Sequence, residues 1–576
     1  MLGNTGGLAR TGYSFVGWNT LANGSGTTYT TGNTFEMGSG NVTLYAEWSA
    51  DVDISIYSNI GRGSGINHVI NLGDASADVY LVSTNTNATA ISPASITLSS
   101  SGRVAIPTPA GRSAIHGEQP VFRDLPEVLE FNEGAVRRLA RRSSASAMRS
   151  MALPSSRVLS VVSDSHTFLH YEGGPVNIPS TARSVVTDGT VTLTVWVADD
   201  GWQDCVSSCR VNLVNQAMVD MIADAFLQSG DENDIYDWVR AVFGDEWGPH
   251  EYDNLIDETN EVDILLYDIE ADNSTNGGVV GFFYAKDIYA RQESGVLATS
   301  NERLMFYLDS VLLAQPEGGS WETTDFWPRE MIVTLAHEFQ HMIHFYQKQV
   351  KRDGVGETWL NEMSSMVAED LVADKVMADG PRGVAYDDPG AGAAGNANGR
   401  LPLYNVWNDI QVTRWGGELK NYSINYALGA YLARVYSGAE LFKDIVQSGH
   451  DGTSAIENAI EEQGFSISFG EVLGNWAIAN ILSDDTSVEN IYKYNSGDWA
   501  YSSVDGASYR LGSINLYNYS GYGQSGPRLY NSGQYASIAS QEAHSNIYID
   551  MGTMNGNSHI AIKADEGNTI SVIIKR

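Results

Sequence analysis

Two histidines stand four residues apart in a stretch whose apolar residues recur at helical spacing. The apolar positions fall within residues 332–346, and Pro328 suits the first turn of a helix there. On this helix His337 and His341 lie one turn apart, so both imidazoles can reach one metal ion. Glu338 can then serve as a base for a water in the open coordination position. The spacing predicts a zinc site.

The third protein ligand has to come from elsewhere. His344 lies about 10 Å along the helix axis from His337, at about 1.5 Å per residue, so we expect it to pack nearby rather than to bind the metal. After a glycine-containing break, a second helical stretch carries Glu362 off its apolar stripe. About twenty residues separate His341 from Glu362, enough for a turn and an antiparallel helix. We therefore predict Glu362 as the third ligand.

These segments resemble the gluzincin metallopeptidases, and within them the hyicolysin family. The resemblance covers roughly residues 158–485 and rests on HEFQHMIHF at 337–345, TWLNEMSSMVAEDL at 358–371 and the stretch at 421–432. It implies a thermolysin-like catalytic domain with a mixed sheet and a helical lobe, acting as an endopeptidase on protein or peptide substrates. The chain as a whole is then expected to be multidomain α+β, with small all-β domains flanking the catalytic one.

The resemblance also assigns roles to single residues. It implies that His337, His341 and Glu362 bind one zinc ion and that Glu338 is the catalytic base. It implies a tyrosine that helps to stabilise the oxyanion, and Tyr422 matches that position best. Tyr426 is the alternative.

One position departs from the gluzincin pattern. Met366 stands where thermolysin-like enzymes carry an aspartate that orients a zinc-binding histidine. Glu369 or Asp370, one turn further on, could take that role.

Two upstream strands could supply the edge along which an extended peptide binds. They lie at Gly281 to Tyr284 and at Leu304 to Tyr307, and the sequence leaves both open. A helical stretch is expected before them, from about Val214 to Phe243.

The regions on either side of the catalytic domain read as short strands separated by turns. Residues 12–48 resemble an internalin-type B-repeat through GWNT and VTLYAEW, and the repeat looks truncated at its start, which would explain why no secretory signal is present. The expected domains are the partial repeat at 1–49, a small β-sandwich-like domain at 50–130, an Arg/Ser-rich linker at 131–157, the metallopeptidase domain at 158–499 and a C-terminal β domain at 500–576.

Charge argues against two classes of partner. The sequence holds 34 basic and 70 acidic residues, a formal net charge of −36, so nucleic acid is a poor partner. No apolar run of 18 residues is present, and we expect no membrane insertion. Composition favours a secreted or cell-surface protein whose β modules contact a cell envelope or a host surface. Cys205 and Cys209 could form a disulfide or remain as thiols.

Three alternatives stay open. A structural calcium ion is one, since the acidic run at 268–272 offers carboxylates, although no segment fits a calcium-loop template. The other two concern function: an inactive surface adhesin on a metallopeptidase scaffold, or an aminopeptidase that shares the zinc site.

Overall fold

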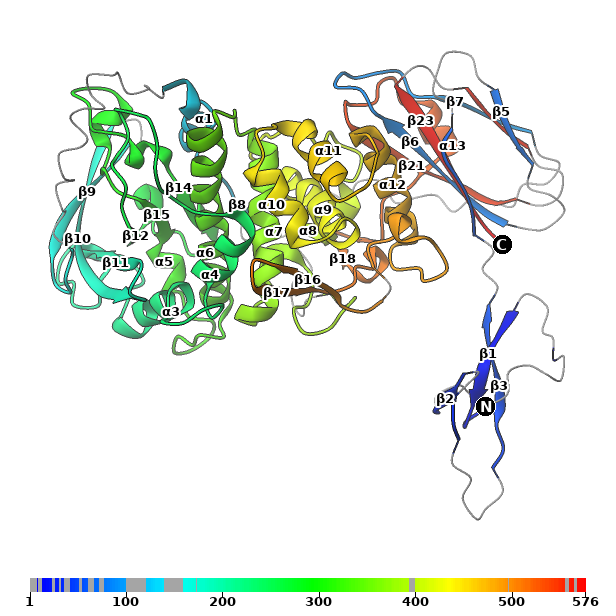
Figure 1. Cartoon of the computed structure of the whole chain (residues 1–576), viewed down its shortest axis with the longest axis horizontal. Coiled ribbons are helices and arrows are strands. Elements are labelled where there is room, and N and C mark those ends of the chain that lie inside the picture. Colours follow the sequence, from blue (N-terminus) through cyan, green and yellow to red (C-terminus); the bar gives the residue numbers. More distant parts are fainter. Residues whose placement is uncertain are drawn as a thin grey trace.

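The computed structural model shows four parts (Figure 1): a sheet, a helical region beside it, a β-sandwich and a small three-stranded unit. It describes residues 8, 13–22, 26–30, 33–35, 42–50, 54–60, 67–71, 77–99, 121–138, 159–171, 174–392, 399–495, 497–554, 559–563 and 567–576.

The six-stranded sheet has the order β14-β15-β12-β11-β10-β9. Its central strands β11, β12 and β15 are parallel and almost entirely buried, as their continuous apolar sequences require. β14 lies at the edge and pairs only with β15 within this sheet, so the Gly281 segment provides the edge strand and the Leu304 segment does not. The strands are β9 (Ser165–Tyr171), β10 (Pro175–Thr187), β11 (Thr192–Ala198), β12 (Glu261–Tyr267), β14 (Gly281–Phe283) and β15 (Met305–Asp309).

The expected helical stretch at 214–243 is two helices, α3 (Gln216–Phe226) and α4 (Ile235–Phe243). The single stretch was wrong because the residues between them are polar and Asp234 caps a new helix, accepting a hydrogen bond from the amide of Asp237. The other helices of this region are α5 (Ser310–Leu313), α6 (Phe326–His344), α7 (Thr358–Val376), α8 (Arg400–Val406), α9 (Leu419–Val435), α10 (Ala439–Gln447), α11 (Gly452–Glu462) and α12 (Phe469–Leu482).

The β-sandwich combines strands from both ends of the chain, drawn in blue and red in Figure 1. β6 (Ala77–Asn85) pairs with β21 (Ser545–Met554) on one side and with β23 (Asn568–Lys575) on the other. The prediction of separate domains at 50–130 and 500–576 is therefore corrected. The remaining strands are β4 (Ile54–Ile60) and β20 (Tyr530–Asn531) in the same sheet, and β5 (Asn67–Asn71), β7 (Ser95–Ser99) and β22 (His559–Lys563) in the facing sheet.

The boundary predicted at residue 499 is also displaced. The hairpin β16–β17 (Ala500–Val504 and Ala507–Leu511) buries Val504, Tyr509 and Leu511 in the core of the helical region. The chain then forms β18 (Ser520–Gly521) and β19 (Gln524–Ser525) before it enters the sandwich at β20, and α13 (Ser532–Ala536) follows that strand.

The predicted linker at 131–157 begins inside a helix. α1 (Pro126–Glu133) and the turn η1 (Ala135–Arg138) pack on the sheet region, with Phe131 and Ala135 buried. This part of the linker prediction was wrong because Phe131 packs edge-on against the rings of Tyr284 and Tyr289. Residues 139–157 lie outside the described residues. Before α1, β8 (Val121–Phe122) pairs with β13 (Gly277–Gly278).

The N-terminal unit is a three-stranded antiparallel sheet of β1 (Tyr13–Asn19), β2 (Thr28–Tyr29) and β3 (Tyr45–Ala50).

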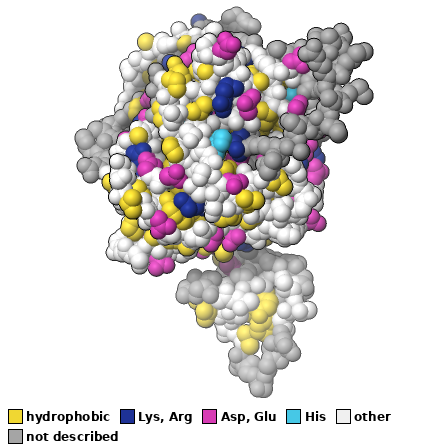
Figure 2. Space-filling view, turned by 90° about the vertical axis from the view of Figure 1, so that its left-hand side faces the viewer, with side chains coloured by type: hydrophobic (Ala, Val, Ile, Leu, Met, Phe, Trp, Pro, Cys, Tyr) yellow, Lys and Arg dark blue, Asp and Glu magenta, His cyan; other side chains and the backbone are white. Residues whose placement is uncertain are grey.

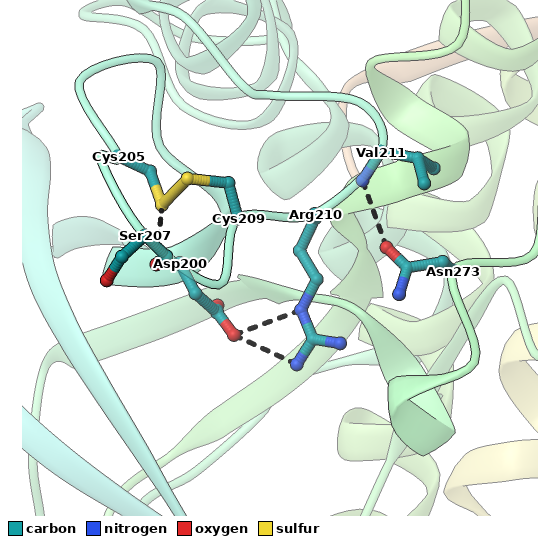
Figure 3. Close-up of a disulfide and its surroundings, with 7 residues drawn as sticks. All are labelled: Asp200, Cys205, Ser207, Cys209, Arg210, Val211 and Asn273. Atoms are coloured by element: carbon teal, nitrogen blue, oxygen red, sulfur yellow. Dashed lines mark hydrogen bonds and ion pairs between the residues drawn. A yellow bond between two sulfur atoms is a disulfide. The ribbon is translucent and has the colours of Figure 1, made fainter.

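The sheet region contains a disulfide between Cys205 and Cys209, with a Cα–Cα distance of 5.7 Å (Figure 3). Of the two states that the sequence left open for these cysteines, the structure has the disulfide. Acidic side chains are scattered over the end of the molecule shown in Figure 2. Among the described helices, none combines the length and apolarity that a bilayer crossing needs.

Candidate metal centre

Helices α6 and α7 bring three predicted ligands to one point. One ligand atom each from His337, His341 and Glu362 lies within 4.8 Å of the others. Glu362 Oε2 is 3.4 Å from His337 Nε2, and Glu362 Oε1 is 3.5 Å from His341 Nε2. These separations exceed ordinary N–H···O hydrogen bonds. They are close to the roughly 3.3 Å between donor atoms that lie about 2 Å from a tetrahedral zinc ion. The three residues therefore fit zinc.

The outward nitrogen of His337 contacts a carboxylate of α7. Nδ1 lies 2.6 Å from Glu369 Oε1, and Arg400 donates to the same carboxylate at 2.5 Å and 3.0 Å. Glu369 thus takes the place open at Met366, whose side chain is buried in the core. Asp370, the other candidate, pairs instead with Arg382 and Arg434. Arg400 could not be identified from the sequence, because nothing in its local pattern links it to α7.

The Nδ1 atom of His341 also contacts side chains of α7, but these are neutral. Its Nδ1 lies 3.0 Å from Asn361 Oδ1 and 3.0 Å from Ser365 Oγ, and the Ser365 hydroxyl donates to Gln340 Oε1. Both neighbours of Nδ1 can accept a hydrogen bond from its N–H, which leaves the Nε2 lone pair for a metal. Asn361 and Ser365 lie on either side of Glu362 on α7. They were not predicted as site residues, and their only signal in the sequence is their position close to the predicted ligand.

The pKa values of the two histidines are shifted in opposite directions. Burial lowers the pKa of His337, but the carboxylates of Glu362 and Glu369 outweigh it and raise that pKa to about 10. For His341, burial dominates and lowers the pKa to about 4. The same two histidines keep the pKa of Glu362 below its ordinary value despite burial. The ligand carboxylate is therefore ionised at neutral pH, as metal binding requires.

Glu338 is buried beside this cluster. Burial, with the negative charges of Glu362 and Asp124, raises its pKa to about 8, although His337 acts in the opposite direction. Within the described part of the chain, its Oε2 atom has no hydrogen-bond partner. A carboxylate with a raised pKa and a free oxygen in a cleft is suited to accept a proton from a bound water.

Tyr422 lies in the first turn of α9 and lines the same cavity as the histidines. Its hydroxyl donates a hydrogen bond to Asp124 Oδ1. Tyr426, the alternative, is fully buried and is not among the described residues that line the cavity; its hydroxyl has no hydrogen-bond partner within the described chain. Arg400 lies over both rings.

The cavity beside the cluster has a volume of about 320 Å³. The edge strand β14 lines this cavity through Gly281, Phe282 and Phe283, and α8 and α9 also contribute lining residues. Residues within 123–133, which precede all other lining residues in the sequence, also line the cavity. Nothing in the sequence indicated this contribution.

Other histidines and acids lie outside the cluster. His344 is buried, and neither ring nitrogen has a hydrogen-bond partner among the described residues, so it packs as expected. In the acidic run at 268–272, Asp268 pairs with Arg210 and accepts from the amide of Asn273. That carboxylate is already satisfied without calcium.

Comparisons with known proteins agree with this geometry. The model of the family described as Peptidase M30 matches residues 178–515, and a repeat model described as the Listeria-Bacteroides repeat domain matches residues 4–47. The neutral metalloprotease ShpI of Staphylococcus hyicus is 27% identical over 298 residues, which cover 50% of this chain and 55% of that protein. The chain thus spans about half the length of this curated relative.

Two proteins of Evansella cellulosilytica match short stretches in the repeat region. Their names describe membrane proteins, and they are 51% identical over 55 residues and 50% identical over 44 residues. These matches cover 9% and 8% of this chain, and 6% and 7% of the two relatives. They therefore concern the repeat and not the metal centre.

Proposed function

The chain belongs to the peptidase M30 family, and on this premise we propose that it is a zinc-dependent endopeptidase that acts outside the cell or at its surface. The observation that carries the proposal is the cluster of His337, His341 and Glu362 with Glu338 buried beside it. Its donor set and spacing fit zinc, with the fourth position left for water and substrate.

When bound, zinc supplies a Lewis acid for the scissile carbonyl and acidifies the attacking water. Glu338 accepts the water's proton at its carboxylate and later returns it to the leaving amine. The Tyr422 hydroxyl donates a hydrogen bond to the developing oxyanion. Glu369 and Arg400 fix the ring of His337, and Asn361 and Ser365 fix that of His341.

The edge strand β14 is proposed to bind the substrate backbone. Within the described part of the six-stranded sheet, its outer side faces the cavity, so an extended peptide can pair with it while its scissile bond lies beside Glu338. Cleavage within an N-acetylated peptide supports an endopeptidase, whereas a requirement for a free α-amine would identify an aminopeptidase.

The location outside the cell is supported by the disulfide between Cys205 and Cys209, since disulfides persist in oxidising compartments. The N-terminal repeat is proposed to contact an envelope or host surface.

The test combines metal analysis with turnover. We expect one zinc per chain, casein cleavage that a chelator abolishes, and loss of zinc in His337→Ala. Glu338→Gln should keep the metal and lose about 10²- to 10⁴-fold in turnover, the usual contribution of a general base. Bound zinc without cleavage of any substrate, in a chain whose cavity is open, would favour the inactive adhesin.

A further inference from the structure

A segment far upstream of the zinc ligands lies in the cavity that the substrate needs. Residues 121–138, here called the docked segment, comprise β8, α1 and η1. Side chains of this segment and of His337, Glu338 and Glu362 line one cavity.

Asp124 fixes the segment at the catalytic end of the cavity. Its two carboxylate oxygens accept hydrogen bonds from Tyr422 Oη and, at 3.2 Å, from Trp415 Nε1. The carboxylate is also close enough to Glu362 and His337 for their charges to act on it. The proposed oxyanion donor, Tyr422, is thus already engaged by a carboxylate of the same chain.

Asn132 fixes the segment at the sheet edge. Its Nδ2 donates to the Phe283 carbonyl at 2.7 Å, and its Oδ1 accepts from the Ala285 amide at 2.9 Å. The side-chain amide therefore uses a backbone donor and a backbone acceptor at the end of β14. These are the kind of groups with which an extended peptide pairs when it adds to an edge strand.

Apolar contacts and one strand pair hold the rest. Leu125, Val128, Phe131 and Ala135 are buried against the core of the peptidase region. The Arg123 amide donates to the Gly278 carbonyl at 3.1 Å, next to the pairing of β8 with β13. Burial of these four apolar side chains holds the segment in place by packing, in addition to the two polar contacts of Asp124 and Asn132.

From these contacts we propose that the docked segment is an inhibitory element: it occupies the substrate cleft, with Asp124 masking Tyr422 and Asn132 masking the end of β14. The inference rests on the proposed peptidase function. Substrate and segment then compete for the same two groups, and release of the segment activates the enzyme.

The test compares the zinc-loaded full chain with variants at the two anchors. Asp124→Ala and Asn132→Ala each remove one anchor, and Glu130→Gln changes an exposed residue of α1 as the matched control. Since each lost hydrogen bond weakens docking several-fold, the double variant should cleave a quenched fluorescent peptide at least about tenfold faster. The control should cleave at the wild-type rate. Hydrogen exchange at the Arg123 amide, whose acceptor is the Gly278 carbonyl and is removed by neither substitution, is measured in parallel and reports release without relying on turnover.

Faster exchange together with faster cleavage supports the proposal. Faster exchange with equal or slower cleavage overturns it, because the released segment would then not have been inhibitory. Unchanged exchange in the double variant also overturns it, since the two contacts would not hold the segment. If the segment is released and zinc is retained but no variant cleaves any peptide, the proposed peptidase function fails, and the inhibition inference falls with it.

Discussion

His337 Nδ1 and Glu369 Oε1 lie 2.6 Å apart and join helix α6 to helix α7 directly behind the metal cluster. The contact keeps the Nδ1 proton on the outer side of the ring, so that Nε2 faces Glu362. Arg400 neutralises the buried carboxylate and, with His337, keeps the pKa of Glu369 low despite burial.

Removal of this contact should weaken zinc binding. We expect Glu369→Gln to lower zinc affinity about 10- to 100-fold, the usual effect of removing a partner of a metal-binding histidine. Competition with a chromogenic chelator measures this, with Glu461→Gln on the exposed face of α11 as control. Equal affinity in both variants would show that α7 does not orient His337.

The two candidate tyrosines can be separated by matched substitutions. In an Asp124→Ala background, which frees the hydroxyl, Tyr422→Phe should reduce kcat about 10²-fold with a smaller change in KM, as loss of an oxyanion donor does. Tyr426→Phe removes a hydroxyl that is buried away from the cavity and should leave kcat within about twofold. The opposite order would assign the role to Tyr426.

The ligand set could be predicted from the sequence because its information is local. The spacing of His337 and His341 fixes their common helix face. The π-helix at Phe345–Val350 and the loop up to Thr358 then return the chain so that Glu362 lies beside them. Even the departure at Met366 left only two candidates for the orienting carboxylate, and both lie on α7.

Contacts between distant segments could not be predicted in this way. Asp124 reaches Tyr422 only because β8 adds to Gly277–Gly278, and no local pattern marks that pairing. Likewise, the apolar residues of β6 predict a strand, but its local pattern does not say which strands will pair with it. The division of the sandwich into two domains was wrong for this reason.

The activity should fall on the acid side through the titration of Glu338. Burial raises the pKa of this group to about 8, and a bound cation would lower it. The acid limb of the pH–activity profile therefore lies below about pH 8. A general base works when deprotonated, hence kcat/KM is lost as pH falls through this pKa. Because the form that turns over has the docked segment released, and Asp124 with it, Asp124→Asn should raise the rate but leave the position of this limb unchanged. A kcat/KM profile of both proteins measures this, and a limb that shifts in the variant would mean that Asp124 stays beside Glu338 during turnover.

A destabilising substitution in one strand of the sandwich should weaken the whole sandwich, although its strands come from opposite ends of the chain. Ile570 on β23 is fully buried and pairs with Ser83 on β6 and with Ile60 on β4. Ile570→Ala should lower the free energy of unfolding of the sandwich by about 2 to 5 kcal/mol through the cavity it leaves.

Hydrogen exchange locates that loss. In Ile570→Ala the amides of β6 should exchange faster together with those of β23, because the two strands share one hydrogen-bonded ladder. Tyr501→Ala, at a side chain that is 77% exposed on the β16–β17 hairpin, should leave both strands unchanged. Faster exchange confined to β23 would mean that the N-terminal strands are stable without it, as two separate domains would require.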